Sequence, residues 1–173
     1  MNLVLIGFKA SGKSTLGPHL AALLQKTYTD TDTLVEEINL KNTSESLSCR
    51  DIFTNMGERH FRGLEELALF RVQSRRNLVI GTGGGTVCVR NATSLLQATG
   101  HVIFLDTCET LLEKRLQSLK TPLFIDGNWR KLHAERYQMY LDAAHTVVKI
   151  ESDTPPEDLA QELARQVAHC TRL

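Results

Sequence analysis

The sequence predicts an α/β fold in which helices cover both faces of a mostly parallel sheet. Short apolar runs, rich in leucine or β-branched residues, alternate with longer amphipathic stretches. A glycine-rich turn separates the first run from the first amphipathic stretch. The chain has 173 residues, 42% of them hydrophobic, which suits a single domain over residues 1–173 with one core.

Strands are expected where apolar residues follow one another without alternation, because the strands of a parallel sheet are buried on both faces. Four such runs are Leu3–Ile6, Leu78–Ile80, Val102–Leu105 and Val147–Ile150. A shorter strand is expected at Thr27–Thr29, which brings the number to five.

Helices are expected where apolar residues recur every three or four positions, as Leu64 and Ala68 do within Glu58–Arg75. The last helix is expected to begin with Thr154 as its N-cap and Pro155 at its first helical position, with acidic residues in the first turn. The body of this last helix is expected at Glu157–His169. The other expected helices are Ser14–Gln25, Leu34–Ile38, Leu111–Leu119 and Trp129–Ala144.

Charge and cysteine content argue against several classes of protein. Lys+Arg and Asp+Glu number 20 each, whereas nucleic-acid binders and binders of acidic membranes usually have a basic excess. The cysteines Cys49, Cys88, Cys108 and Cys170 lack zinc-ligand spacing, so we expect free thiols. No secretory signal is recognisable, and no apolar run approaches about 18 residues. We expect a cytoplasmic protein that binds neither nucleic acid nor membrane.

The first motif is a phosphate-binding loop. Residues 7–14 read GFKASGKS, which matches GxxxxGK[ST] between an apolar strand and a helix. Its glycines let consecutive amides point into one concavity, and the following helix adds its positive end. Lys13 supplies a charge for the β- and γ-phosphates, and the Ser14 hydroxyl is a ligand for Mg²⁺. The motif indicates a nucleoside triphosphate with magnesium and leaves the phosphoryl acceptor open.

Two carboxylates, Asp30 and Asp32, stand where the second strand is expected to end, and ligands of open α/β sheets bind at such ends. One suits a water-mediated contact to Mg²⁺, and the other suits a proton acceptor for an alcohol. The residues alone equally allow Asp32 to be the N-cap of the helix around Leu34–Ile38.

Arg62 and Glu65 are three residues apart and share a helix face, so the spacing allows an ion pair between them. By itself Arg62 has the pattern of a solvated helix charge. Gly83, Gly84 and Gly85 follow the strand Leu78–Ile80, and adjacent glycines at a strand end favour close approach of the backbone to a ligand.

Arg136 alone also reads as a surface charge. Its neighbours Tyr137, Met139 and Tyr140 are expected to pack in the core or at its rim rather than to contact a cofactor.

Taken together, these motifs resemble the shikimate kinase family, small P-loop kinases that phosphorylate the 3-hydroxyl of shikimate with MgATP in chorismate and aromatic amino-acid biosynthesis. The resemblance runs from Leu3 to about Val167. Beyond the phosphate loop, it is carried by Asp30-Thr31-Asp32, the segment from Ile52 through Gly57-Glu58 and Phe61-Arg62 to Glu65, Gly83–Gly85, Pro122-Leu123, Arg136 and Thr154–Ala160.

The resemblance implies roles for the matching residues. On the nucleotide side, the phosphates of ATP would be bound by Gly7, Ala10, Ser11, Gly12, Lys13, Ser14 and Thr15. Ser14 would bind Mg²⁺ directly, and Asp30 would bind it through water. Arg115, or else Lys114, would pack on the adenine, and the loop at Pro155 would close the other side.

On the acceptor side, Asp32 would hydrogen-bond the reacting hydroxyl and serve as the catalytic base, with Lys13 as its partner on the phosphates. Arg62 and Arg136 would bind the carboxylate of shikimate, since a planar guanidinium gives paired bonds. Backbone groups of Gly83, Gly84 and Gly85 would complete the substrate site.

The fold implied is the three-layer P-loop kinase fold, with five parallel strands in the order 2-3-1-4-5. A substrate-binding region would span about residues 32–67, and a mobile lid about residues 118–128. A monomer is the expected state for a neutral kinase of this size.

Three features depart from the family pattern. Thr121 stands where an arginine usually precedes Pro122-Leu123, and we expect the adjacent Lys120 to replace it as a catalytic cation, with Arg130 as the other candidate. In the phosphate loop, Lys9 is bulky and charged, and Ala10 replaces a frequent glycine. The third departure is the absence, after Arg136, of the Pro-Leu-Tyr that often follows the arginine.

Two other functions remain open at this point. A gluconate-type kinase also recognises a carboxylate, so two arginines do not separate it from a shikimate kinase. A non-catalytic nucleotide-binding module would fit a lid that has lost its arginine. The triplet at residues 30–32 and the glycines at 83–85 favour shikimate.

Overall fold

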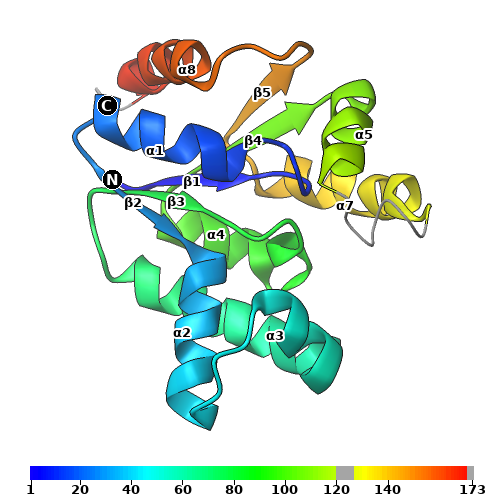
Figure 1. Cartoon of the computed structure of the whole chain (residues 1–173). Helices are drawn as coiled ribbons and strands as arrows, with labels where there is room; N and C mark the ends of the chain where they lie inside the picture. The colour runs from blue at the N-terminus through cyan, green and yellow to red at the C-terminus, as the bar shows by residue number, and fades with distance from the viewer. Residues whose placement is uncertain (120–126, 171–173) are drawn as a thin grey trace.

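The computed structural model describes the backbone of residues 1–119 and 127–170, and the side chains of these residues as far as Val167. Its centre is a five-stranded parallel sheet in the order β2-β3-β1-β4-β5 (Figure 1). The strands are β1 (Leu3–Ile6), β2 (Thr27–Asp30), β3 (Leu78–Gly81), β4 (His101–Thr107) and β5 (Thr146–Ile150). The predicted fold class and strand order are confirmed.

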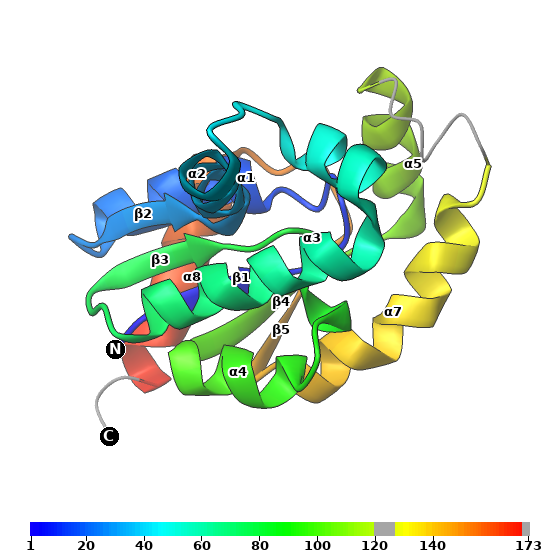
Figure 2. The ribbon, with the colours of Figure 1, turned by 90° about the horizontal axis from the view of Figure 1, so that it is seen from below.

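Helices cover both faces of this sheet, as the two views in Figures 1 and 2 show. One face packs against α1 and α8, and the other packs against the second half of α3 together with α4 and α7. A third apolar cluster lies between α2 and α3, with residues from both sides of a kink in α3 at Gly57, and it contains no strand residue. The helices are α1 (Lys13–Leu23), α2 (Thr31–Thr43), α3 (Cys49–Gln73), α4 (Ala92–Thr99), α5 (Glu109–Ser118), α7 (Trp129–Ala143) and α8 (Pro156–Cys170), with a 3₁₀ turn η1 at Thr86–Cys88.

The middle of the sheet is buried as predicted, but its edge is not. All four residues of β1 and of β3 are buried, because these strands have neighbours on both sides and helices on both faces. In β5 buried and exposed residues alternate, and Val147 is 43% exposed. The prediction that this strand is buried on both faces was therefore wrong, and the reason is its position at the sheet edge.

Two helical segments were not predicted, α4 and the first half of α3. Gly57 has φ 82° and ψ 164°, so it interrupts α3 with a sharp kink. The sequence pattern identified only the regular half after this kink. At the chain's end, α8 starts one residue later than expected, at Pro156. A following proline disfavours the helical conformation, and the carbonyl of Pro155 accepts from the N–H groups of Asp158 and Leu159, so Pro155 takes the cap position in place of Thr154.

All five strands run parallel, so their carboxyl ends lie at the same edge of the sheet. The connections that follow β1, β2 and β3 at this edge are the phosphate loop, the start of α2 and the glycine run at residues 83–85. None of the described helices combines the length and the apolar character needed to span a membrane.

Candidate active site

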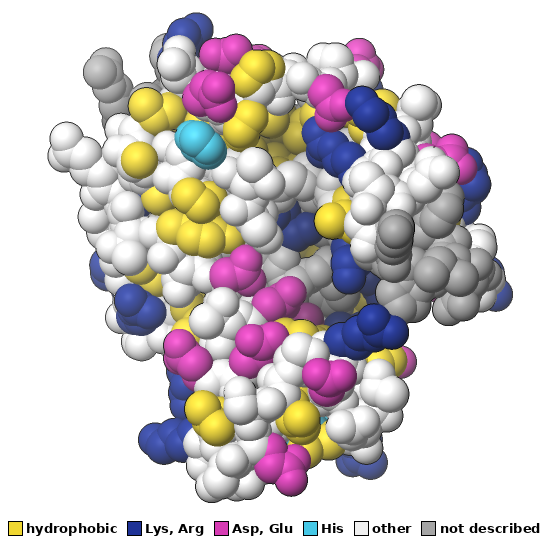
Figure 3. Space-filling view, viewed as in Figure 1, with side chains coloured by type: hydrophobic (Ala, Val, Ile, Leu, Met, Phe, Trp, Pro, Cys, Tyr) yellow, Lys and Arg dark blue, Asp and Glu magenta, His cyan; other side chains and the backbone are white. Residues whose placement is uncertain are grey.

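A cavity of about 1100 Å³ opens at the carboxyl edge of the sheet. The space-filling view shows a hollow at this place, with Lys and Arg side chains at its border (Figure 3). The cavity is lined by the phosphate loop, the start of α2, both halves of α3, the glycine run, α5, α7 and the loop before α8. The predicted site residues among them are Ala10, Ser11, Gly12, Lys13, Ser14, Thr15, Asp32, Arg62, Gly83, Gly84, Gly85, Arg115 and Arg136.

The phosphate loop forms one end of this cavity. Gly12 has φ 102°, a left-handed conformation that favours glycine, and α1 begins at the next residue. Within the described part of the chain, the N–H groups of Ala10, Gly12, Lys13 and Ser14 have no hydrogen-bond acceptor. Such amides at a helix N-terminus are donors for an anion.

Lys13 is buried beneath the loop. Its Nζ donates to the carbonyl oxygens of Gly7 and Phe8 at 2.8 Å and to Ser11 Oγ at 3.2 Å. Burial lowers the pKa of Lys13 to about 8, while the nearby carboxylates of Asp32 and Asp30 act in the opposite direction. Gly7 does not line the cavity and contributes through this carbonyl.

Asp30 ends β2 and caps α2. Its Oδ1 accepts from the N–H of Asp32 at 2.9 Å, and its Oδ2 accepts from Tyr28 Oη at 3.0 Å and from Ser14 Oγ at 3.3 Å. The N-cap is therefore Asp30, and the alternative that gave this role to Asp32 is wrong. Asp30 is not part of the cavity wall and reaches it through Ser14.

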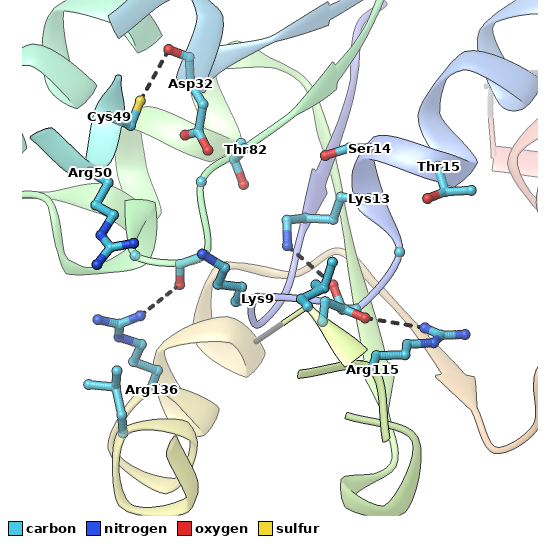
Figure 4. Close-up of a pocket in the computed structure, with 18 of the residues that line it drawn as sticks. Lys9, Lys13, Ser14, Thr15, Asp32, Cys49, Arg50, Thr82, Arg115 and Arg136 are labelled. Carbon is cyan, nitrogen blue, oxygen red and sulfur yellow. Dashed lines mark hydrogen bonds between the residues drawn. The ribbon is translucent and has the colours of Figure 1, made fainter. Parts of the chain in front are cut away.

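Asp32 lies in the first turn of α2 and lines the cavity, near Thr82 in Figure 4. Burial, together with the nearby carboxylates of Asp30 and Glu65, raises the pKa of Asp32 to about 6. A carboxylate whose pKa lies near 6 is suited to accept a proton close to neutral pH.

Arg62 is paired and largely enclosed rather than solvated. Its guanidinium forms ion pairs with Glu65 and, at 3.1 Å, with Glu58. The Glu65 side chain is 1% exposed, and its Oε1 accepts from Thr86 Oγ1 at 2.9 Å. The ion pair that the spacing allows is therefore present, and this chain of contacts holds Arg62 against the glycine run.

The glycine run is required for space rather than for unusual backbone angles. A Cβ at Gly83 would lie 2.6 Å from Asp32 Oδ1, and one at Gly85 would lie 2.5 Å from Arg62 Nη1. Gly83 donates its N–H to Thr31 Oγ1 at 3.2 Å. The N–H groups of Gly84 and Gly85 have no acceptor among the described residues.

Arg136 and Tyr140, both on α7, donate hydrogen bonds to the backbone of this run. Tyr140 Oη donates to the Gly84 carbonyl at 2.6 Å, and Arg136 Nη1 donates to the same oxygen at 3.2 Å (Figure 4). Tyr140 is buried, as predicted, whereas Met139 is 42% exposed. The buried Nε of Arg136 has no partner in the described structure, so it remains a donor for an anion.

At the phosphate-loop end of the cavity, Arg115 lies beside the loop. It donates to the Ala10 carbonyl at 3.3 Å and forms an ion pair with Asp153 at 3.0 Å. Thr154 and Pro156 line the cavity there, but Pro155 does not. Of the expected lid, residues 120–126 lie outside the described residues, and Lys120 and Thr121 are among them.

Comparison with known proteins assigns this arrangement to a family. The shikimate kinase family model matches residues 9–168. The chain is 35% identical to shikimate kinase from Prochlorococcus marinus over 99% of its length and 89% of the relative's. It is 34% identical to the Aquifex aeolicus enzyme, over 94% of each chain.

The chain belongs to the shikimate kinase family.

Solved structures agree with this assignment. Shikimate kinase from Acinetobacter baumannii, in complex with shikimate, has a TM-score of 0.82 at 30% identity and covers 98% of this chain and 94% of its own. The enzyme from Bacteroides thetaiotaomicron has a TM-score of 0.83 at 27% identity, with coverage of 97% and 98%. This shikimate kinase family member therefore shares the fold of both along nearly its whole length.

Among the polar residues of the cavity wall that sequence reasoning missed are Lys9, Arg50 and Thr82. Lys9 was noticed only as a departure within the phosphate motif. Arg50 lies in the unpredicted first half of α3, so no periodic pattern pointed to it. Thr82 stands beside the glycines, and its hydroxyl donates to the Leu5 carbonyl at 3.0 Å, which only the strand pairing reveals.

Proposed function

We propose that this shikimate kinase family member transfers the γ-phosphoryl group of ATP to the 3-hydroxyl of shikimate. One observation carries the proposal: a single cavity holds a phosphate loop at one end and, at the other, a carboxylate base beside two arginines and free backbone amides. The first end fits a triphosphate, and the second fits a small hydroxylated carboxylate.

On the nucleotide side, the free amides of the loop and the Lys13 ammonium bind the phosphates. Ser14 and Asp30 fit a magnesium ion, because Mg²⁺ takes one or two protein oxygens and completes its shell with phosphates and water. Their oxygens lie 3.3 Å apart, so both face one point beside the loop. When bound, the ion neutralises charge on the phosphates.

On the acceptor side, Arg62 and Arg136 bind the carboxylate, together with the N–H groups of Gly84 and Gly85. Asp32 accepts the proton of the attacking hydroxyl. The hydroxyl oxygen forms a bond to the γ-phosphorus while the bond from that phosphorus to the β–γ bridging oxygen breaks. ADP leaves with the electron pair of that bond.

The proposal also includes an acceptor-binding region and a lid. Residues 32–67 form the acceptor-binding region, and residues 118–128 form a lid that closes after substrate binds, because transfer to water would otherwise compete. In this proposal Lys120 is the catalytic cation of the lid. The other candidate, Arg130, stacks on Trp129 and forms an ion pair with Glu113 at 2.8 Å. The monomeric state and the cytoplasmic location stay predictions.

The test is steady-state ADP release from MgATP with shikimate, with gluconate or with no acceptor. We expect turnover with shikimate alone. Turnover with gluconate would identify the alternative kinase. Binding of ATP by calorimetry without turnover on either acceptor would identify a nucleotide-binding module and overturn the proposal.

A further inference from the structure

Lys9 lies where the two ends of the cavity meet. It belongs to the phosphate loop. A Cβ atom added at Gly84 would lie only 2.9 Å from the backbone nitrogen of Lys9, so the loop and the glycine run pack closely against each other at this residue. Figure 4 shows the Lys9 side chain between Lys13 and Arg136. Its charge therefore lies between the phosphate site and the acceptor site.

The Lys9 ammonium also lacks a partner. The side chain is exposed in the cavity and makes no hydrogen bond or ion pair with any residue that the structure describes. Lys13, in contrast, uses three acceptors within the loop. Both side chains line the same cavity, and the charge of Lys9 acts in the direction that lowers the pKa of Lys13.

The other cations of the cavity are placed differently. Arg62, Arg115 and Arg136 each bond to a carboxylate or a backbone carbonyl of the protein. Arg50 is exposed like Lys9, but it lies on the first half of α3, on the acceptor side beside Cys49 (Figure 4). Lys9 is thus the unpaired cation of the described cavity that stands next to the phosphate loop.

We propose that Lys9 is a further catalytic residue, whose Nζ binds the γ-phosphoryl group during transfer. This inference rests on the proposed function. As the bond to the acceptor oxygen forms and the bond to the bridging oxygen breaks, negative charge is spread over the three equatorial oxygens. An ammonium between donor and acceptor binds this charge more strongly in the transition state than in either ground state, and such a contact raises kcat.

The test compares Lys9→Met, which removes the charge at similar length, with Lys9→Arg, which keeps it. We expect kcat of Lys9→Met to fall by about 10²-fold, the usual loss for one stabilising donor. KM for shikimate and Kd for ATP should stay within about threefold, since the contact belongs to the transition state. Lys9→Arg should recover most of the rate. The matched control is Lys41→Met, which removes an exposed charge in the last turn of α2.

A second measurement needs no turnover. ADP with aluminium fluoride imitates the transferring phosphoryl group, and we expect Lys9→Met to bind it at least tenfold more weakly than wild type while binding ADP alone equally well. Unchanged kcat and unchanged aluminium fluoride affinity in Lys9→Met would overturn the inference, and a loss confined to Lys120→Met would assign the charge to the lid instead. Failure of the proposed function would appear separately, as wild-type protein that does not turn over shikimate.

Discussion

The two ends of the cavity are built on different principles. The phosphate site at the nucleotide end is one stretch of residues 7–15, and its binding groups are mainly backbone N–H groups at the start of α1. The acceptor end collects side chains from α2, α3 and α7 around the glycine run. A loop conformation determines the first, whereas the second requires three helices and a strand end to be in place together.

This difference has consequences for tolerance to substitution. A backbone N–H group remains available as a donor after most substitutions of its own side chain. The loop therefore keeps its conformation with Lys9 and Ala10 in it, and Ala10 adopts a left-handed φ of 67°. At the acceptor end, Arg62 is held by Glu65, and Glu65 by Thr86, so each contact depends on the next. We therefore expect single substitutions to break acceptor binding while ATP binding persists.

Asp32→Asn should give the largest effect. The amide keeps the shape of the side chain but cannot accept the proton of the hydroxyl, so kcat should fall by about 10²–10⁴-fold. ATP affinity, measured by calorimetry, should stay within about threefold, because the phosphate loop is unchanged. In the wild type, kcat/KM should fall as pH drops below about 6, where Asp32 becomes protonated. Equal kcat for both proteins at pH 7.5 would remove Asp32 from the mechanism.

Gly85→Ala tests the packing of the acceptor end. Its Cβ would meet the Arg62 guanidinium, which Glu58 and Glu65 hold in place, so the arginine must shift from its position. We expect KM for shikimate to rise about tenfold or more, equivalent to the loss of about one charged hydrogen bond, with Kd for ATP unchanged. Gly63→Ala is the matched control, because its Cβ would meet nothing within 4 Å. Similar KM values in the two variants would contradict the packing argument.

The stability of the site should depend on pH through Asp32. Its folded pKa, about 6, lies above the ordinary value of 3.8, so the fold favours the protonated acid. The resulting penalty is absent below pH 3.8, grows as pH rises between the two values and is complete above pH 6. Asp32→Asn should therefore exceed wild type in free energy of unfolding by about 1–3 kcal/mol at pH 7.5 and match it near pH 4. Urea titrations at both pH values measure the free energy of unfolding of the two proteins. A difference between them that does not change with pH would show that the Asp32 charge is not its cause.

Tyr140→Phe should give the smallest effect. It removes the hydroxyl that donates to the Gly84 carbonyl and leaves Arg136 as the remaining donor to that oxygen. We expect kcat/KM for shikimate to fall about three- to tenfold, or about 1 kcal/mol, the net value of one neutral hydrogen bond. Tyr137→Phe is the control, since its hydroxyl donates to Asp106 at 3.1 Å, away from the run. Equal kcat/KM values for the two variants would show that Tyr140 contributes by packing and that its hydrogen bond to Gly84 is not needed for activity.

The parts of the fold that sequence reasoning missed have three separate physical causes. The first half of α3 is separated from the regular half by the backbone of Gly57, so no continuous period crosses it. The helix α4 has eight residues, too few for a clear period, and no side chain caps its start. The exposed face of β5 depends on its position at the sheet edge, which follows from pairing and not from its own residues.

By itself the sequence determined the fold class, the strands of the sheet and the phosphate loop, because these depend on residues adjacent in the chain and on local backbone preferences. Only the tertiary structure decided that Asp32 lines the same cavity as the phosphate loop, and that the buried Glu65 beside Arg62 accepts from Thr86. It also decided that Arg136 reaches Gly84, 52 residues away in the chain. Burial at the acceptor end and the contacts to the glycine run arise between distant segments, and they exist only once the helices have packed on the sheet.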